Sequence, residues 1–106
     1  MLVFFATINI YHFIFPTIMI KESGEWGIRR KLLKKLYLHR IIQHKHTSFD
    51  NLPKGFPPHL RGAVKEVAEW LIKEGLLLSK PTSYGLEVSL NHERIQEIKM
   101  IIEEGP

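Results

Sequence analysis

The sequence predicts a mainly α-helical domain with one small β-hairpin, which is an α+β fold. Apolar residues recur at helical spacing near residues 26–44, 58–74 and 91–102. Between the last two stretches, residues 86–90 alternate apolar with polar side chains, as a strand with one buried face does. A chain of 106 residues is long enough for one core, so we expect residues 21–106 to form one domain.

Charged residues are distributed unevenly along the chain. The formal net charge is +4, yet residues 1–20 carry no charged side chain. Residues 21–46 contain eight Lys or Arg against two Glu, whereas residues 47–106 contain seven basic against nine acidic residues. Any attraction of an anionic partner therefore begins at the first charged helix. The absence of cysteine excludes disulfides, thiolate metal sites and cysteine nucleophiles, and suits a reducing, cytoplasmic location.

Residues 1–20 are rich in β-branched and aromatic side chains, and three interpretations of them stay open. High strand propensity favours a packed strand or helix. The length just reaches that of a membrane anchor, although Asn9, His12 and Pro16 interrupt the apolar run. The third interpretation is a start-site artefact, because Met19 begins a plausible protein by itself. No positive n-region or small-residue cleavage site indicates a secretory signal. Contact with a membrane is expected only if residues 1–20 form an anchor.

The first helix of the domain is predicted over residues 26–44. One stripe of this helix is apolar and is formed by Ile28, Leu32, Leu36 and Ile42. In its second half the remaining sides are apolar too, with Leu33, Tyr37, Leu38 and Ile41. This half must therefore be buried on several faces, either by this fold or by a second copy of the chain.

Two more helices are predicted to follow. Thr47 or Ser48 is a suitable N-cap for a short second helix, which a Pro-Lys-Gly stretch ends. A pair of prolines suits the start of a third helix, whose core-facing stripe is formed by Leu60, Val64, Val67 and Leu71. Gly75 ends the third helix, because glycine adopts the left-handed conformation without steric cost.

A β-hairpin and a last helix complete the prediction. The strands are residues 76–80 and 86–90, and residues 81–85 form a five-residue loop that contains proline and glycine. Asn91 is a suitable N-cap for the last helix, whose apolar positions are Ile95, Ile98, Ile101 and Ile102.

The order helix, short helix, helix, hairpin and helix resembles that of the winged helix-turn-helix superfamily over about residues 26–102. The most specific stretch is residues 64–90, in which the third helix runs directly into the hairpin. Many winged-helix proteins end their recognition helix with the phrase Leu-x-x-x-Gly-Leu, which here is Leu71-Ile72-Lys73-Glu74-Gly75-Leu76. In general character the chain also resembles small archaeal-type DNA-binding proteins. The resemblance implies a three-helix core with a wing and a C-terminal helix.

The resemblance also implies sequence-specific binding of double-stranded DNA and a role in transcriptional regulation. In this superfamily the third helix enters the major groove by its N-terminal half, and the wing contacts the adjacent backbone. The recognition helix corresponds to about residues 58–74, with candidate contacts at His59, Arg61, Gly62, Lys65, Glu66 and Glu69. The wing corresponds to residues 80–85, with candidate contacts at Lys80, Thr82, Ser83 and Tyr84. On the first helix, the candidate phosphate contacts are Arg29, Arg30 and Lys34.

The chemistry of the third helix supports this hypothesis in part. Arg61 is suited to a guanine edge or a phosphate, Lys65 adds positive charge, and Gly62 allows the backbone to approach closely. The glutamates of this helix oppose it, because they repel phosphate unless they point away or accept from a cytosine amine. The alternative is a winged-helix module that binds another protein and no DNA, with or without a membrane tether. We also expect a homodimer through the last helix and the apolar end of the first, with the N-terminal segment as a further candidate for the interface.

Neither a metal site nor catalysis is predicted. Of the six histidines, His39, His44 and His46 lie close in sequence, but spacings of five and two do not place them on one face of a helix. The sequence has no Gly-rich phosphate loop, no nucleophile elbow and no carboxylate pair in an apolar setting. We therefore expect no enzyme activity and no cofactor.

Overall fold

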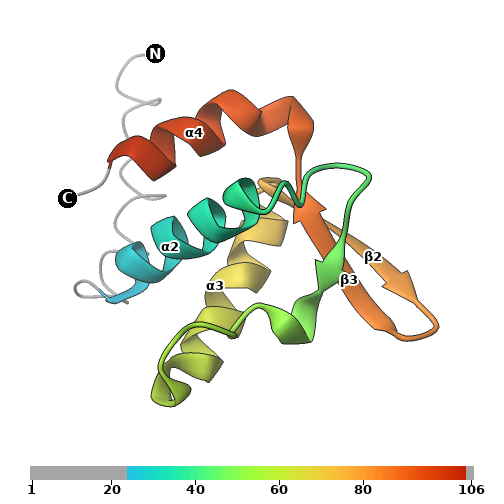
Figure 1. Cartoon of the computed structure of the whole chain (residues 1–106), viewed down its shortest axis with the longest axis horizontal. Helices are drawn as coiled ribbons and strands as arrows, with labels where there is room; N and C mark the ends of the chain where they lie inside the picture. The colour runs from blue at the N-terminus through green and yellow to red at the C-terminus, as the bar shows by residue number, and fades with distance from the viewer. Residues whose placement is uncertain (1–23, 105–106) are drawn as a thin grey trace, which may run out of the picture.

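The computed structural model describes residues 24–104, so the predictions for residues 1–20 lie outside the described residues. Three helices and a three-stranded antiparallel sheet make up this part of the chain (Figure 1). The helices are α2 (Gly24–Leu38), α3 (Arg61–Lys73) and α4 (Ile95–Glu104), and the strands are β1 (Thr47–Ser48), β2 (Leu77–Thr82) and β3 (Gly85–Leu90). The predicted α+β class is confirmed.

One apolar core joins the helices and the sheet. α2 lies between α3 and α4, and the hairpin of β2 and β3 extends away from the helices (Figure 1). Each helix and both hairpin strands give this core fully buried side chains, among them Leu32, Leu33, Leu71, Leu77, Val88, Leu90 and Ile98. Burying one such leucine or isoleucine stabilises the fold by about 1.5–3 kcal/mol relative to leaving it exposed. The core therefore holds the three helices at fixed positions around the base of the hairpin.

α2 ends at Leu38, six residues before the predicted end of the first helix. Arg40 adopts a φ of 57°, in the left-handed region, and this reverses the chain after the helix. The Ile41 amide donates to the Leu36 carbonyl at 2.9 Å, and the Arg40 amide donates to the Tyr37 carbonyl at 3.0 Å. These are the two hydrogen bonds of a Schellman motif, which ends helices.

The prediction of helix over residues 39–44 is therefore wrong. The apolar residues there belong to a turn that returns Ile41 to the core and pairs Ile42 with Leu90 of β3 in an isolated bridge. The apolar side chains on the remaining sides of the second half of the predicted helix are mostly buried within the chain: Leu33 and Ile41 are buried, and Tyr37 packs against the core. Leu38 is the exception, since 65% of it is exposed.

α3 ends in the same motif, built around Gly75. Gly75 has a φ of 84°, the Leu76 amide donates to the Leu71 carbonyl at 3.0 Å, and the Gly75 amide donates to the Ile72 carbonyl at 3.0 Å. Leu71 and Leu76 are both buried in the core, where this motif typically makes an apolar contact. The Leu-x-x-x-Gly-Leu phrase is thus a helix end that directs the chain into β2.

The hairpin turn is tighter than predicted. β2 and β3 pair as far as Thr82 and Gly85, so Ser83 and Tyr84 alone form the loop. Thr82 Oγ1 accepts from the Tyr84 amide at 3.1 Å and donates to the Gly85 carbonyl at 2.7 Å. Pro81 lies within β2, which tolerates a missing amide because it is an edge strand. The prediction of a five-residue loop is wrong, because the threonine hydroxyl closes a two-residue turn.

A 3-10 turn, Phe49–Asn51, stands where the short second helix was predicted. Ser48 caps this turn, because its hydroxyl accepts from the Asp50 amide at 3.2 Å. The preceding strand β1 pairs antiparallel with β3, and the sequence pattern does not predict it. A second 3-10 turn, Pro58–Leu60, precedes α3. This turn and α3 together span residues 58–73, where the third helix was predicted.

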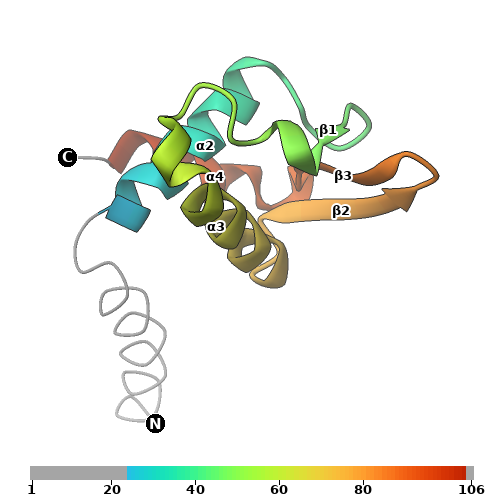
Figure 2. The ribbon, with the colours of Figure 1, turned by 90° about the horizontal axis from the view of Figure 1, so that it is seen from below.

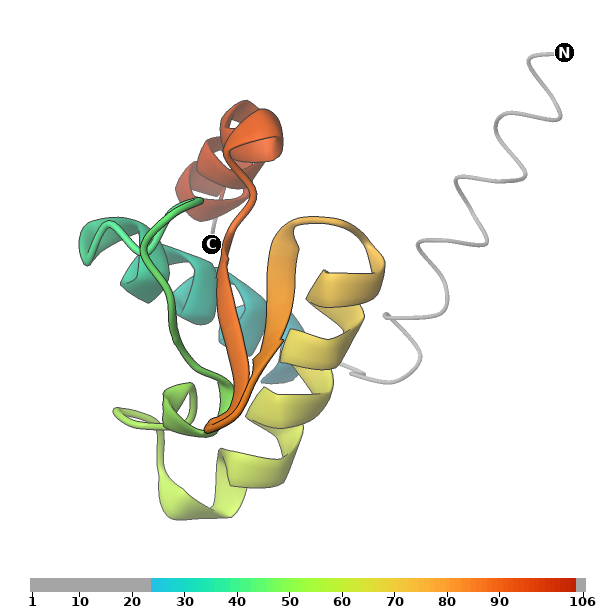
Figure 3. The same cartoon turned by 90° about the vertical axis from the view of Figure 1, so that its right-hand side faces the viewer.

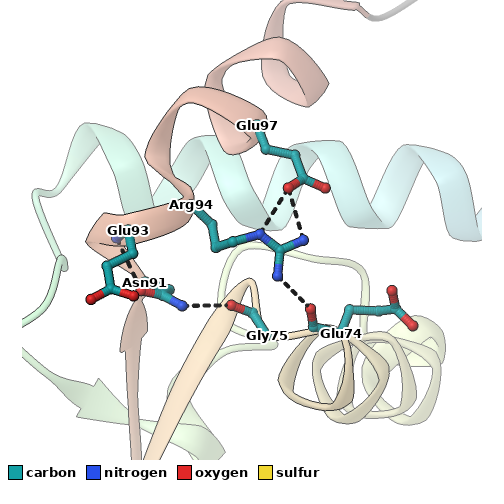
Figure 4. A network of polar contacts seen from close by, with 6 residues as sticks. All are labelled: Glu74, Gly75, Asn91, Glu93, Arg94 and Glu97. Atoms are coloured by element: carbon teal, nitrogen blue, oxygen red, sulfur yellow. Dashed lines mark hydrogen bonds and ion pairs between the residues drawn. The ribbon is translucent and has the colours of Figure 1, made fainter.

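A group of polar contacts holds the start of α4 against the end of α3 (Figure 4). Arg94 donates through Nη1 to the Glu74 carbonyl at 3.0 Å and through Nε to Oε1 of Glu97 at 2.8 Å. Asn91 donates to the Gly75 carbonyl at 2.9 Å and, as predicted, caps the turn that leads into the last helix. These bonds satisfy carbonyls that the end of α3 leaves unpaired, and they fix α4 relative to α3.

Candidate nucleic-acid interface

α3 and the hairpin diverge from the Gly75 turn, and their free ends lie on the same side of the molecule (Figures 1 and 3). The free end of α3 is its N-terminus, which follows the Pro58–Leu60 turn, and the free end of the hairpin is its two-residue loop. The segment with β1 lies between these two ends (Figure 2). The N-terminal end of α3 and the tip of the hairpin are therefore presented on one side.

The first turn of α3 exposes an arginine. Arg61 is the first residue of α3, and its side chain forms no hydrogen bond or ion pair with the residues that the structure describes. His59 and Gly62 beside it are exposed, and a Cβ at Gly62 would meet no atom within 4 Å. Lys65 is half-buried and turned aside, since its Nζ lies 3.1 Å from Oδ1 of Asp50. Arg61 is therefore the main accessible cation of this turn.

Farther along α3 the exposed face is acidic. The residues that face the core are Val64, Val67, Ala68 and Leu71. Their placement leaves Glu66 and Glu69 exposed on the opposite side, with Lys73 exposed at the end of the helix. Phosphate is repelled by two carboxylates on one face. The accessible positive charge of this helix is consequently at its two ends.

The hairpin tip presents an aromatic side chain. Tyr84 is 96% exposed, and Ser83 beside it is exposed as well. The Thr82 hydroxyl is engaged within the turn, so it shapes the loop more than it offers a donor to phosphate. Lys80 is exposed and stands opposite Glu87 in the register of β2 and β3, which places an opposite charge beside it. Tyr84 is thus the most prominent group of the wing.

Two of the three arginine and lysine residues predicted to contact phosphate from the first helix are used for packing. Arg30 Nε donates to the Ile102 carbonyl near the end of α4 at 2.7 Å. The Arg29 guanidinium lies 5.4 Å from the ring centroid of Trp70 on α3, within cation–π range. Both arginines join α2 to its neighbouring helices. Lys34 is the one of the three that is exposed.

Three lysines other than Lys34 converge between α2 and the loop after Phe49–Asn51. Lys31 Nζ donates to the Gly55 carbonyl at 3.2 Å, and Lys35 Nζ donates to the carbonyls of Leu52 at 3.2 Å and Lys54 at 2.6 Å. We call Lys31, Lys35 and Lys54 the lysine cluster. Burial, then the nearby charges of Lys54 and Lys31, lower the pKa of Lys35 below 10.5. Helical spacing places Lys31 and Lys35 next to each other on α2, whereas Lys54 approaches them only because of the path of the loop.

Few large apolar side chains of the described residues are exposed for contact with a second copy of the chain. The predicted dimer helix α4 buries Ile98 and Ile101 within its own chain. Among residues 27–38 of α2 and 95–103 of α4, the large apolar side chains left exposed are Leu38 and Met100, the latter 69% exposed. A homodimer stays a prediction.

Neither a metal-ligand cluster nor a membrane span is found among residues 24–104. No three His, Asp or Glu side chains of this part are grouped as metal ligands. No helix in the same part is both long and apolar enough to cross a bilayer. The anchor hypothesis for residues 1–20 lies outside the described residues.

Comparisons of the chain with protein-family models, with curated proteins and with solved structures find no match. The resemblance to the winged helix-turn-helix superfamily therefore stays a proposal.

Proposed function

We propose that the protein is a winged helix-turn-helix module that binds double-stranded DNA, with α3 as the recognition helix and the hairpin as the wing. The observation that carries this proposal is the placement of the α3 N-terminus and the hairpin tip on one side, with Arg61 and Tyr84 exposed there. The element order supports it, since the hairpin follows α3 directly. The second helix of the superfamily is reduced here to the turn Phe49–Asn51.

Arg61 is the side chain best suited to reach the bases. Its guanidinium has a planar set of donors that pairs with O6 and N7 of guanine or with a phosphate. Because Arg61 begins α3, it enters the major groove first, and Gly62 beside it lets the backbone approach. The Tyr84 hydroxyl and the Lys80 ammonium contact the adjacent backbone from the wing.

The acidic face of α3 determines how the helix docks. Glu66 and Glu69 repel phosphate at close range, so α3 inserts by its N-terminal end rather than lying along the groove. This orientation also brings the positive end of the helix dipole to the phosphates. Two copies in a homodimer would contact half-sites about 34–36 Å apart, as sequence-specific regulators of transcription do.

Binding of a fluorescent 20-base-pair duplex, followed by anisotropy, tests the proposal. We expect Arg61→Gln to weaken binding by about 5- to 150-fold, the equivalent of about 1–3 kcal/mol for one base or phosphate contact. The matched control is Lys99→Gln on α4, which removes one charge elsewhere and should bind as the wild type does.

A double variant with the opposite expected sign makes the test sharper. Glu66→Gln combined with Glu69→Gln should bind the duplex more tightly, because it removes repulsion from phosphate. If Arg61→Gln keeps wild-type affinity and the double variant shows no gain, α3 does not dock on DNA.

The second candidate function is binding of another protein by the same side. It is favoured by the exposed carboxylates of Glu66 and Glu69 and by the exposed Tyr84 and Leu86 of the hairpin, since tyrosine is enriched at protein interfaces. A wild-type chain that binds no duplex at 50 mM salt would give this candidate precedence.

A further inference from the structure

We propose that the lysine cluster of Lys31, Lys35 and Lys54 is a second phosphate-binding site, which holds the backbone of the same DNA duplex beside the α3 contact. This inference rests on the proposed function, because it assigns further contacts to the same partner. Lysine binds phosphate as a point charge, and backbone phosphates receive most of the cationic contacts in protein–DNA complexes.

The fold holds two of the three ammonium groups in place before any ligand binds. Lys31 and Lys35 lie one turn apart on α2, and both donate to carbonyls of the loop over residues 52–55. Lys31 Nζ also lies 4.7 Å from the ring centroid of Phe56. Side chains already ordered in this way lose less conformational entropy when an anion binds.

Hydrogen-bond donors remain free in the cluster. Each ammonium carries three donors. Among the described contacts, Lys31 uses one and Lys35 uses two, whereas the side chain of Lys54 makes none. Phosphate oxygens accept hydrogen bonds from the donors that are left.

The cluster has positive charge and no described counterion. No carboxylate of the described residues pairs with any of the three lysines, since the ion pairs described are Lys65–Asp50 and Arg94–Glu97. Like charges so close together destabilise one another, and a bound anion relieves that repulsion. Exposed Lys34, on the same helix, adds to the field.

The position of the cluster fits a flanking backbone contact. The loop that carries Lys54 runs through the turn Pro58–Leu60 directly into the first turn of α3 (Figure 2). The loop on which the cluster is built therefore adjoins the α3 N-terminus. Duplex DNA carries one negative charge about every 1.7 Å of its axis, so backbone next to an inserted helix end meets a neighbouring cation cluster.

Charge removal at Lys54 tests the inference without breaking a described side-chain contact. Duplex affinity is measured from 50 to 200 mM NaCl for Lys54→Gln, for Lys31→Gln combined with Lys54→Gln, and for the Lys99→Gln control. We expect the slope of log affinity against log salt to become shallower by about 0.9 for the single variant and about 1.8 for the double variant. The slope of Lys99→Gln should match that of the wild type.

The outcomes separate this inference from the proposed function. Equal slopes for Lys54→Gln, the double variant and Lys99→Gln overturn the lysine site, and a loss of affinity in Arg61→Gln then leaves the α3 contact standing. The reverse pattern, with shallower slopes in the lysine variants and full affinity in Arg61→Gln, supports the lysine site and overturns the α3 contact. A wild-type chain that binds polyglutamate but no duplex overturns both and indicates an acidic protein partner.

Discussion

Two substitutions at equivalent positions should change stability in opposite directions. α2 and α3 end in the same pair of hydrogen bonds, but the left-handed residue is Arg40 in the first and Gly75 in the second, with φ values of 57° and 84°. We predict that Gly75→Ala destabilises the fold and that Arg40→Gly stabilises it.

The magnitudes follow from two opposing effects. A side chain in the left-handed region costs about 1–2 kcal/mol, whereas glycine costs about 0.4–1 kcal/mol through the greater freedom of the unfolded chain. The net effect is about 1 kcal/mol for each substitution, destabilising at Gly75 and stabilising at Arg40. At Gly75 the new Cβ would also lie 3.0 Å from Nη1 of Arg94, so this guanidinium, which donates to the Glu74 carbonyl, must give by a few tenths of an ångström. The loss at Gly75 should therefore be the larger of the two.

Urea denaturation followed by circular dichroism measures both effects, and thermal melting checks them. A change of 1 kcal/mol corresponds to about 4–8 °C in a domain of this size. An alanine variant at position 75 as stable as the wild type, or a glycine variant at position 40 that is less stable, would refute the reasoning about the helix ends.

Three further predictions concern the contacts around the core and the surface. Arg94→Gln should destabilise the fold by about 1 kcal/mol because it removes a charged hydrogen bond to the Glu74 carbonyl. Glu97→Gln should cost under about 0.5 kcal/mol because the ion pair of Glu97 with Arg94 is half-exposed. Equal losses of the two variants in urea denaturation would contradict this. The pKa of Lys35, measured by NMR, should lie below 10.5 and should rise in Lys54→Gln, and an unchanged pKa would place Lys54 too far away. Because the folded state lowers this pKa, protonated Lys35 disfavours folding, and the free energy of unfolding should increase as the pH rises through the folded pKa toward 10.5. If the chain forms a homodimer through its exposed apolar side chains, Leu38→Glu combined with Met100→Glu should yield a monomer in analytical ultracentrifugation, and an unchanged dimer would locate the interface elsewhere.

α3 and α4 were predictable because each has a local signal with one physical cause. The core-facing residues of α3 repeat at helical spacing, and the sequence shows that spacing directly. Gly75 marked the helix end because other residues are strained there, and Asn91 marked the last helix because its side chain caps a turn.

The end of α2 was not predictable from the same signals. Arg40 takes the left-handed position that glycine usually fills, so no residue type marks the turn. Ile41 and Ile42 continue the apolar periodicity of the helix, although one lies in the core beyond the turn and the other pairs with Leu90. The pairing of distant segments, which decides this region, leaves no local pattern in the sequence.

The candidate site was predictable in its exposed residues but not in their partners. Arg61 and Tyr84 follow from the helix pattern and the hairpin, and both are exposed. The pairing of Lys65 with Asp50 and the approach of Lys54 to α2 depend on the path of irregular loops. The spacing rules for helices and strands do not describe such loops.

Titration of the isotope-labelled chain with a duplex oligonucleotide, followed by amide NMR spectra, tests the central claim most directly. DNA docked as proposed shifts the amide signals of Lys54, Arg61, Gly62 and Tyr84 and leaves those of α4 unchanged. Shifts confined to α4 and the region of Leu38, or no shifts at all, would contradict the proposed nucleic-acid interface.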